Sequence, residues 1–271
     1  MARSNIPVGI NRSLSRTITI IFLGLLFVVL AGQSHAAEWA SLKGRFVFDG
    51  DPPAPAEITA DKDVEVCGKH KLVNEELVVS EDNGIANVVL FVRSKGVTVH
   101  PDLEDGSKSA PLVLDNKDCR FQPHVGFVQT GQTLTIKNSD PVGHNSNIAT
   151  MKNSPSNSLV PSNGSSDVTF SRDEAIPASV TCNIHPWMKA YLVIRPNPYG
   201  VVTSADGSFE IENLPVGEEL EFQLWHEKGG YLDEFTLGGK KTSAKRGRID
   251  FTVEEGGTDL GDIVVDGKVF N

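Results

Sequence analysis

Hydrophobic and polar residues alternate along most of this chain, which is the pattern of strands that bury one face. The alternation is clearest in five segments, residues 42–48, 112–114, 134–136, 209–211 and 220–224. Val88 to Val92 is instead a continuous apolar run, which predicts a fully buried strand. No stretch has a sustained period of 3.6 residues, so we predict an all-β protein with little helix.

Turn-forming residues divide these strands into groups. Pro196 and Pro198 separate a regular β pattern, which begins near residue 110, from another that follows. Residues 150–166 are rich in Ser, Asn, Pro and Gly, which predicts a long loop or a loosely ordered insert. After residue 36 we therefore expect three parts, namely an N-terminal β segment (37–109), a central domain (110–197) and a C-terminal domain (198–271).

The first 36 residues have the features of a secretory signal peptide. Three arginines precede an apolar run from Ile18 to Ala31, and Ser34-His35-Ala36 fits a small-x-small cleavage site. A retained membrane anchor is the alternative, but the run has 14 residues, whereas a membrane span needs about 20. We therefore expect a periplasmic or secreted protein with no stable membrane span after cleavage.

The charge of the chain restricts its partners. The formal net charge is −10, and cleavage after residue 36 removes three arginines and no acidic residue, which leaves a net charge of −13. An acidic surface disfavours nucleic acid and anionic membranes and steers basic partners, although solubility alone also explains it. We therefore expect no nucleic-acid partner.

Four residues with metal-binding side chains stand out among the predicted strands. Cys182, His185 and Met188 share one seven-residue loop, and His144 follows a strand-like segment far enough upstream to pack beside that loop. A lone Cys or Met is usually a core residue, because both pack as adaptable hydrophobic side chains. One thiolate, two imidazoles and one thioether are instead the donor set of a blue-copper electron-transfer site.

The cysteines form an odd set of three. In an oxidising compartment, an odd count predicts one disulfide and one thiol with a separate role. Cys182 lies among the potential metal ligands and is the natural free thiol. Cys67 and Cys119 would then form a disulfide, and two free thiols at these positions are the alternative.

The ligand segments resemble those of the cupredoxins. Cys182-x-x-His185-x-x-Met188, with Pro and an aromatic residue between the His and the Met, resembles the copper loop of the amicyanin branch. Asp140-x-x-x-His144-Asn145 resembles the first-ligand corner of plastocyanin, pseudoazurin and amicyanin. The loops of plastocyanin and pseudoazurin are longer between His and Met, so the short loop favours the amicyanin-like group. Over residues 110–196 the resemblance implies a cupredoxin Greek-key β-sandwich.

The resemblance also implies a role for each ligand residue. His144, Cys182 and His185 would be the equatorial ligands of one type 1 copper ion, and Met188 would be its weak axial donor. Asn145 matches the residue that ties the two ligand loops together near the cysteine sulfur. Hydrogen bonds of this kind orient the ligands and tune the metal.

In cupredoxins, the redox partner docks on an apolar rim around an exposed ligand edge. Pro186 and Trp187 are the residues that would form this rim here, and electrons would pass through the edge of His185. The alternative is that Trp187 packs inward.

A second resemblance involves the two ends of the chain. Residues 203–217 contain Thr-x-x-Asp-Gly-x-Phe followed by Asn-Leu-Pro-x-Gly, which is similar to the carboxypeptidase regulatory-like, transthyretin-like β-sandwich. Gly44 to Pro52 is similar to the opening strand of that family. The resemblance implies a second, smaller Ig/transthyretin-like β-sandwich. The copper domain is then either inserted between residues 41–98 and 199–271 of this sandwich, or the two domains follow one another in tandem.

The absence of several motifs narrows the function. The chain has no His-x-His pair, as multicopper oxidases need, and no Cys-x-x-x-Cys, as a binuclear electron-transfer copper site needs. It also has no Gly-x-Ser-x-Gly, no His-Glu-x-x-His and no phosphate-binding loop. We therefore expect an electron carrier and not an enzyme. The resemblance implies a c-type cytochrome or a periplasmic dehydrogenase as its partner.

Two other functions remain open at this point. The first is a binding or structural module outside the cytoplasm, in which the C-terminal sandwich attaches to carbohydrate or to the cell envelope. Trp225 and Tyr231 would then be candidates for stacking on sugars. The second is copper storage or delivery, which needs labile, Met-rich donors, but only Met151 and Met188 remain after the initiator.

Overall fold

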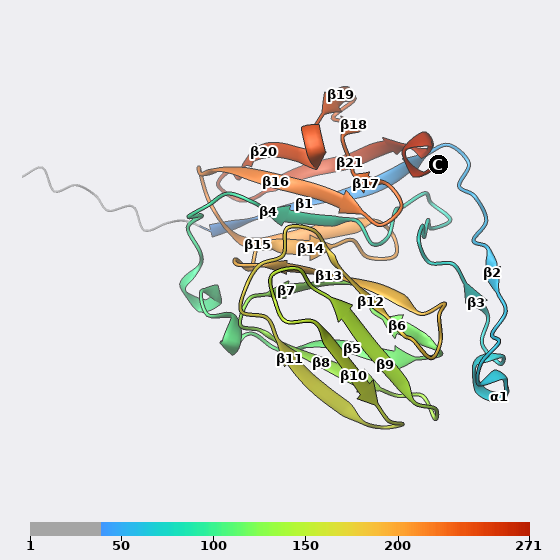
Figure 1. Cartoon of the computed structure of the whole chain (residues 1–271). Coiled ribbons are helices and arrows are strands. Elements are labelled where there is room, and N and C mark those ends of the chain that lie inside the picture. The colour runs from blue at the N-terminus through green and yellow to red at the C-terminus, as the bar shows by residue number, and fades with distance from the viewer. Residues whose placement is uncertain (1–38) are drawn as a thin grey trace, which may run out of the picture. The chain divides into compact units, whose positions relative to one another are not determined.

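The structure is a computed structural model that describes residues 39–271 (Figure 1). The predicted signal peptide, residues 1–36, lies outside the described residues. The described chain is all-β, as the alternation predicts, and its only α-helix is the single turn α1 (Val64–Cys67). Four short 3₁₀ turns complete the helical content, η1 (Pro101–Leu103), η2 (Gly106–Lys108), η3 (Lys245–Gly247) and η4 (Gly267–Phe270). Within residues 39–271, no helix has the length and apolar character needed to cross a bilayer.

Residues 112–195 form a β-sandwich, which we call the central sandwich. Its strands are β5 (Leu112–Lys117), β6 (Arg120–Gln122), β7 (Val125–Gln129), β8 (Thr133–Asn138), β9 (His144–Ala149), β10 (Ser156–Val160), β11 (Ser165–Thr169), β12 (Ala178–Thr181) and β13 (Lys189–Arg195). One sheet has the order β10-β9-β12-β13-β7 and the other β11-β8-β5-β6. The alternating apolar residues of both sheets meet in one buried cluster, which includes Leu114, Ile136, Ile148, Val180 and Leu192.

Residues 150–166 are not the loop that their composition predicts. They contain β10 and the start of β11, which pair antiparallel with β9 and β8 respectively. Half of the positions on β10 and β11 are exposed and only Val160 is buried, so Ser and Asn are acceptable side chains there. Pairing with a neighbouring strand satisfies the backbone. Composition alone therefore missed two edge strands.

A second sandwich, which we call the terminal sandwich, uses strands from both ends of the described chain. Its sheets have the orders β15-β1-β21-β18-β19 and β14-β4-β16-β17, with β20 paired to β16. The strands are β1 (Trp39–Asp49), β4 (Val89–Val92), β14 (Gly200–Val202), β15 (Ser208–Pro215), β16 (Glu219–His226), β17 (Gly230–Tyr231), β18 (Glu234–Leu237), β19 (Lys240–Ser243), β20 (Arg248–Thr252) and β21 (Thr258–Asp266).

Strand pairing fixes how the ends of the chain combine in the terminal sandwich. Strand β1 lies between β15 and β21, antiparallel to the first and parallel to the second (Figure 1). Strand β4 lies between β14 and β16 and is buried along its whole length. Each sheet thus combines an early strand with late ones, and the central sandwich lies between them in the chain. The family resemblance of the terminal sandwich stays a prediction.

Between β1 and β4, residues 57–76 form a segment that we call the strap. It contains β2 (Glu57–Ile58), α1 and β3 (Leu72–Val73), and β2 and β3 pair antiparallel. A disulfide joins Cys67 of the strap to Cys119 in the β5–β6 turn, with a Cα–Cα distance of 5.5 Å. Both cysteines are buried in a small cluster with Ala60 and Leu72, against which Trp187 packs. The strap is therefore fixed against the central sandwich beside the predicted ligand loop.

Candidate metal centre

Three of the predicted ligands meet at one end of the central sandwich. His144 begins β9, and Cys182 and His185 lie in the loop that joins β12 to β13. Because β12 pairs antiparallel with both β9 and β13, this loop lies next to the start of β9. One ring nitrogen of each histidine and the cysteine sulfur lie within 4.8 Å of one another, and all three residues are buried.

The cysteine is the only free thiol among residues 39–271, and it is buried. Its sulfur accepts the backbone N–H of His185 at 3.4 Å and lies 3.7 Å from Nδ1 of the same residue. Asn145 contacts both ligand segments, because its Oδ1 lies 3.5 Å from Cys182 Sγ and accepts the N–H of Asn183 at 2.8 Å. Asn145 thus links the two segments beside the sulfur, and its effect on a bound metal stays a prediction.

A carboxylate holds each histidine through the Nε2 atom. Nε2 of His144 lies 2.9 Å from Oδ2 of Asp140, and Nε2 of His185 lies 2.8 Å from Oδ2 of Asp63. Nδ1 of His144 is buried and has no hydrogen-bond partner among the described residues. A carboxylate on one ring nitrogen selects the tautomer that leaves the other nitrogen free as a metal ligand. Both Nδ1 atoms are therefore available beside the thiol.

Interactions within the site shift the pKa values of two of these residues. Burial raises the pKa of the Cys182 thiol, but interactions with His144 and His185 outweigh it and lower this pKa to about 5. Burial lowers the pKa of His144, but the hydrogen bond to Asp140 and the interaction with Cys182 raise it to about 9. Both shifts favour the thiolate of Cys182 and the protonated form of His144 when no metal is bound. A metal ion would replace the imidazolium proton.

Met188 closes the ligand loop through its backbone. Its N–H donates to the carbonyl of His185 at 2.9 Å, and its carbonyl accepts the N–H of Cys182 at 3.3 Å. The side chain is 1% exposed and belongs to the same apolar cluster as Cys182. Met188 is thus buried beside the site, and its role as an axial donor stays a prediction.

The prediction of an exposed ligand edge is wrong. His185 is 0% exposed, because the strap covers it and Asp63 occupies its Nε2. Trp187 does not form an open rim either, since its indole N–H donates to the carbonyl of Cys119 at 3.1 Å and its ring packs against the strap cluster. Of the predicted rim, only Pro186 is exposed.

Sequence reasoning missed Asp63 as a residue of the site. It lies 122 positions before His185 in a polar segment with no assignable pattern, so no local signal marks it. Asp140 is different, because it belongs to the segment that resembles the first-ligand corner of the cupredoxins. It lies four positions before His144 and also accepts the backbone N–H groups of Asp118 and Cys119.

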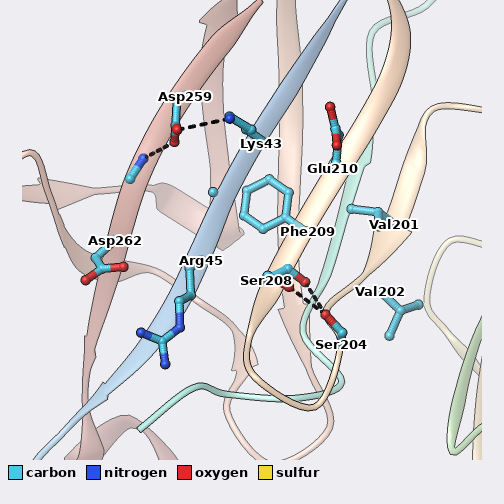
Figure 2. A pocket seen from close by; sticks show the side chains of 12 residues that line it. Lys43, Arg45, Val201, Val202, Ser204, Ser208, Phe209, Glu210, Asp259 and Asp262 are labelled. Atoms are coloured by element: carbon cyan, nitrogen blue, oxygen red, sulfur yellow. Dashed lines mark hydrogen bonds and ion pairs between the residues drawn. The ribbon is translucent and has the colours of Figure 1, made fainter. Parts of the chain in front are cut away.

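Two other features of the described residues are not separate metal or ligand sites. Cys119, Asp140 and His144 also lie within 4.8 Å of one another, but the sulfur of Cys119 is committed to the disulfide. A hollow of about 570 Å³ on the terminal sandwich carries charged residues of both signs from β1 and β21 (Figure 2). Its two cationic side chains are paired within the protein, Lys43 with Asp259 at 3.4 Å and Arg45 with Asp82 at 2.6 Å.

The residues of the centre fit a copper ion of the blue type. A buried thiol and two buried imidazoles supply the sulfur and nitrogen donors that such a site uses. Nδ1 of His185 contacts the thiol sulfur itself. The strongest single indication of a metal ligand is Nδ1 of His144, which is buried and has no hydrogen-bond partner among the described residues. A buried polar atom without a partner destabilises a protein core, and coordination to a metal ion would provide that partner.

No protein-family model and no curated protein matches this chain. Solved structures of copper proteins are similar to part of it, and we give three. A Cu-containing nitrite reductase from Thermus scotoductus SA-01 is 17% identical over 38% of this chain and 25% of its own, with a TM-score of 0.30. A mutant of amicyanin in the Cu(I) state is 17% identical over 39% of this chain and 98% of its own, with a TM-score of 0.28.

A purple cupredoxin from Nitrosopumilus maritimus is 19% identical over 32% of this chain and 99% of its own, with a TM-score of 0.27. At these TM-scores the similarities do not support assigning this chain to a family or a function. The case for a metal centre rests on the geometry of His144, Cys182 and His185.

Proposed function

We propose that this protein is an exported type 1 copper protein that carries single electrons between redox partners outside the cytoplasm. The observation that carries the proposal is the convergence of one buried thiol and two carboxylate-held imidazoles on the same point. The Cys67–Cys119 disulfide supports an oxidising compartment, which agrees with the predicted signal peptide.

His144, Cys182 and His185 would hold the copper ion, with Met188 as a weak fourth donor. Bound copper supplies a one-electron couple between Cu(I) and Cu(II). The protein contributes a rigid setting, because Asp140 and Asp63 fix the two rings and the hydrogen bonds of Met188 fix the loop. A site that is fixed in advance rearranges little when the charge changes, which favours electron transfer.

The proposed ligands fit an electron carrier better than an enzyme. All three ligand residues are buried, and we infer that no open position is left for a substrate at the metal. A c-type cytochrome or a periplasmic dehydrogenase is the partner class that we propose.

The alternative function, a carbohydrate- or envelope-binding module, receives less support. Trp225 is only 9% exposed and packs edge-on against Tyr191, with ring centroids 5.2 Å apart. Tyr231 packs partly buried against the same cluster. These aromatic rings join the two sandwiches and are not free to stack on sugars.

A visible and EPR spectrum of residues 37–271 titrated with Cu(II) tests the proposal. We expect an intense thiolate-to-copper charge-transfer band and a narrow copper hyperfine splitting, both lost in Cys182→Ser. Met188→Leu should keep the band and shift the reduction potential, and Met151→Leu is its matched control because Met151 is 74% exposed. A colourless wild-type protein with copper would refute the carrier and leave the binding module as the better explanation.

A further inference from the structure

The outer face of the metal centre is closed by a residue from outside the central sandwich. His185 is fully buried although its neighbours in the loop, Ile184 and Pro186, reach solvent. The carboxylate of Asp63 lies against its Nε2, with 42% of the Asp63 side chain exposed. Asp63 therefore stands between His185 and the solvent, at the place where the resemblance predicts an open edge.

The backbone at Asp63 is arranged for this contact. Asp63 precedes α1 in the N-cap position, where an aspartate normally accepts a backbone N–H of the first helical turn through its side chain. The carbonyl of Asp63 accepts the N–H groups of Val66 and Cys67 at 2.8 Å, as is usual at this position, but its side chain makes no capping bond. Asp63 also adopts the left-handed conformation, with φ 45° and ψ 42°. A strained residue whose carboxylate is diverted from its usual partner points to a function for that carboxylate.

Several contacts hold the strap in this position. The disulfide joins α1 to Cys119, whose backbone N–H donates to Asp140 and whose carbonyl accepts from Trp187. Glu75, near the end of the strap, pairs with Arg120 of β6 at 3.2 Å. Glu76 pairs with Lys228 of the terminal sandwich. With anchors on both sandwiches, the strap has the contacts expected of a fixed wall.

We propose that the strap is the outer wall of the metal centre and that Asp63 is the positioning residue for His185. Through its carboxylate, Asp63 holds the ring so that Nδ1 faces Cys182, and it keeps the ring edge away from solvent and from a docking partner. This inference rests on the proposed copper site, and it adds that the His185 edge is closed to direct contact in the structure described here.

The contact itself is tested without copper. We expect ¹⁵N NMR of the metal-free protein to show a His185 Nε2 proton that exchanges slowly with water. Asp63→Gly should abolish this protection, and glycine suits the left-handed backbone, so the variant should fold. Asp63→Asn keeps an acceptor without the charge and should retain part of the protection. Asp61→Asn, an exposed carboxylate two residues upstream, is the matched control and should match the wild type.

The role of the contact is tested in the copper-loaded protein. Loss of a carboxylate that holds a ligating histidine typically weakens metal binding about 10- to 100-fold, and we expect this range for Asp63→Gly. In Asp63→Gly we expect two rates to increase. One is the rate at which the cation hexaammineruthenium(II) reduces the copper-loaded protein, and the other is the rate at which the anion hexacyanoferrate(III) oxidises the reduced protein. Loss of a negative charge alone would slow the reaction with the cation and speed that with the anion.

The outcomes separate the two proposals. Unchanged proton exchange, or opposite rate changes with the two complexes, would overturn the wall even if the wild-type protein shows its charge-transfer band. A protein without that band in any variant would overturn the copper carrier. Proton exchange in the metal-free protein would then still decide whether Asp63 holds His185.

Discussion

The two histidines of the candidate metal centre are held by the same chemistry but by different parts of the chain. Asp140 and His144 are four positions apart at one corner of the central sandwich, and Asp140 is 4% exposed. Asp63 and His185 are 122 positions apart, and Asp63 is partly exposed on the strap. The inner pair is thus part of the sandwich itself, whereas the outer pair exists only because the strap folds across the loop.

The two carboxylates are expected to differ in what they affect, which is the stability of the fold for Asp140 and the access of solvent to the site for Asp63. Asp140 accepts three hydrogen bonds in a buried position, so the corner depends on it. The carboxylate of Asp63 accepts one hydrogen bond at the surface, so the fold depends on that carboxylate little. We infer that the inner carboxylate preserves the architecture and the outer carboxylate controls how the site meets solvent and partner. Four changes test this division.

Removal of the Cys67–Cys119 disulfide should have the largest effect on stability. The bond closes a loop with a sequence separation of 52, and a loop of that size restricts the unfolded chain enough to stabilise the fold by about 4 kcal/mol. Cys67→Ala/Cys119→Ala should lower the free energy of unfolding in urea by this order and increase proton exchange at His185 Nε2. Protection of that proton at the wild-type level would show that the disulfide does not hold the strap.

Asp140→Ala should destabilise the protein by about 3 kcal/mol, because it leaves buried donors and the His144 imidazolium without their acceptor. Burial raises the pKa of Asp140, but hydrogen bonds from His144 and from the N–H groups of Cys119 and Asp118 outweigh it and lower this pKa. Urea unfolding of the metal-free protein measures the loss. A change below about 1 kcal/mol, the range of an exposed ion pair, would contradict a structural role for the inner pair.

A third carboxylate–histidine pair, Glu227 with His124 at 2.6 Å, lies outside the metal centre and serves as a reference. Burial raises the pKa of Glu227, but hydrogen bonds from His124 and Lys189 outweigh it and lower this pKa to about 2. Since the pKa in the folded protein lies below the unfolded value, the stabilisation is complete above that unfolded value and is lost as the pH falls towards 2.

Glu227→Gln should therefore cost about 2 kcal/mol at neutral pH and remove part of the acid sensitivity below pH 4.5. Urea unfolding at a series of pH values gives both quantities. The copper spectrum should not change, because neither Glu227 nor His124 belongs to the ligand cluster. An altered spectrum would mean that this pair acts on the metal centre as well.

Asp63→Gly should have the smallest effect on stability, below about 1 kcal/mol, because the carboxylate is partly exposed and glycine suits the left-handed backbone. Its effect on proton exchange at His185 should nevertheless exceed that of Asp140→Asn, which keeps an acceptor at the inner corner. If Asp63→Gly destabilised the protein as strongly as Asp140→Ala, the contrast between the inner and outer pairs would disappear.

Much of the site was predictable because its signals are local. Cys182, His185 and Met188 share a loop, and Asp140, His144 and Asn145 share a corner. Both groups can therefore be recognised from their short spacing in the sequence. The edge strands β10 and β11 were not predictable from composition, because polar side chains suit positions that face solvent.

The sequence by itself determined the all-β class, the candidate donor residues, and the presence of one cysteine beyond a disulfide pair. Period-two alternation, ligand spacing and an odd number of cysteines are all properties of neighbouring residues or of composition. Only the tertiary structure decided that β1 and β4 complete a sandwich with strands more than a hundred residues later, and that Asp63 covers His185. Strand pairing and a single carboxylate contact depend on distances in space, and no local pattern in the chain records them.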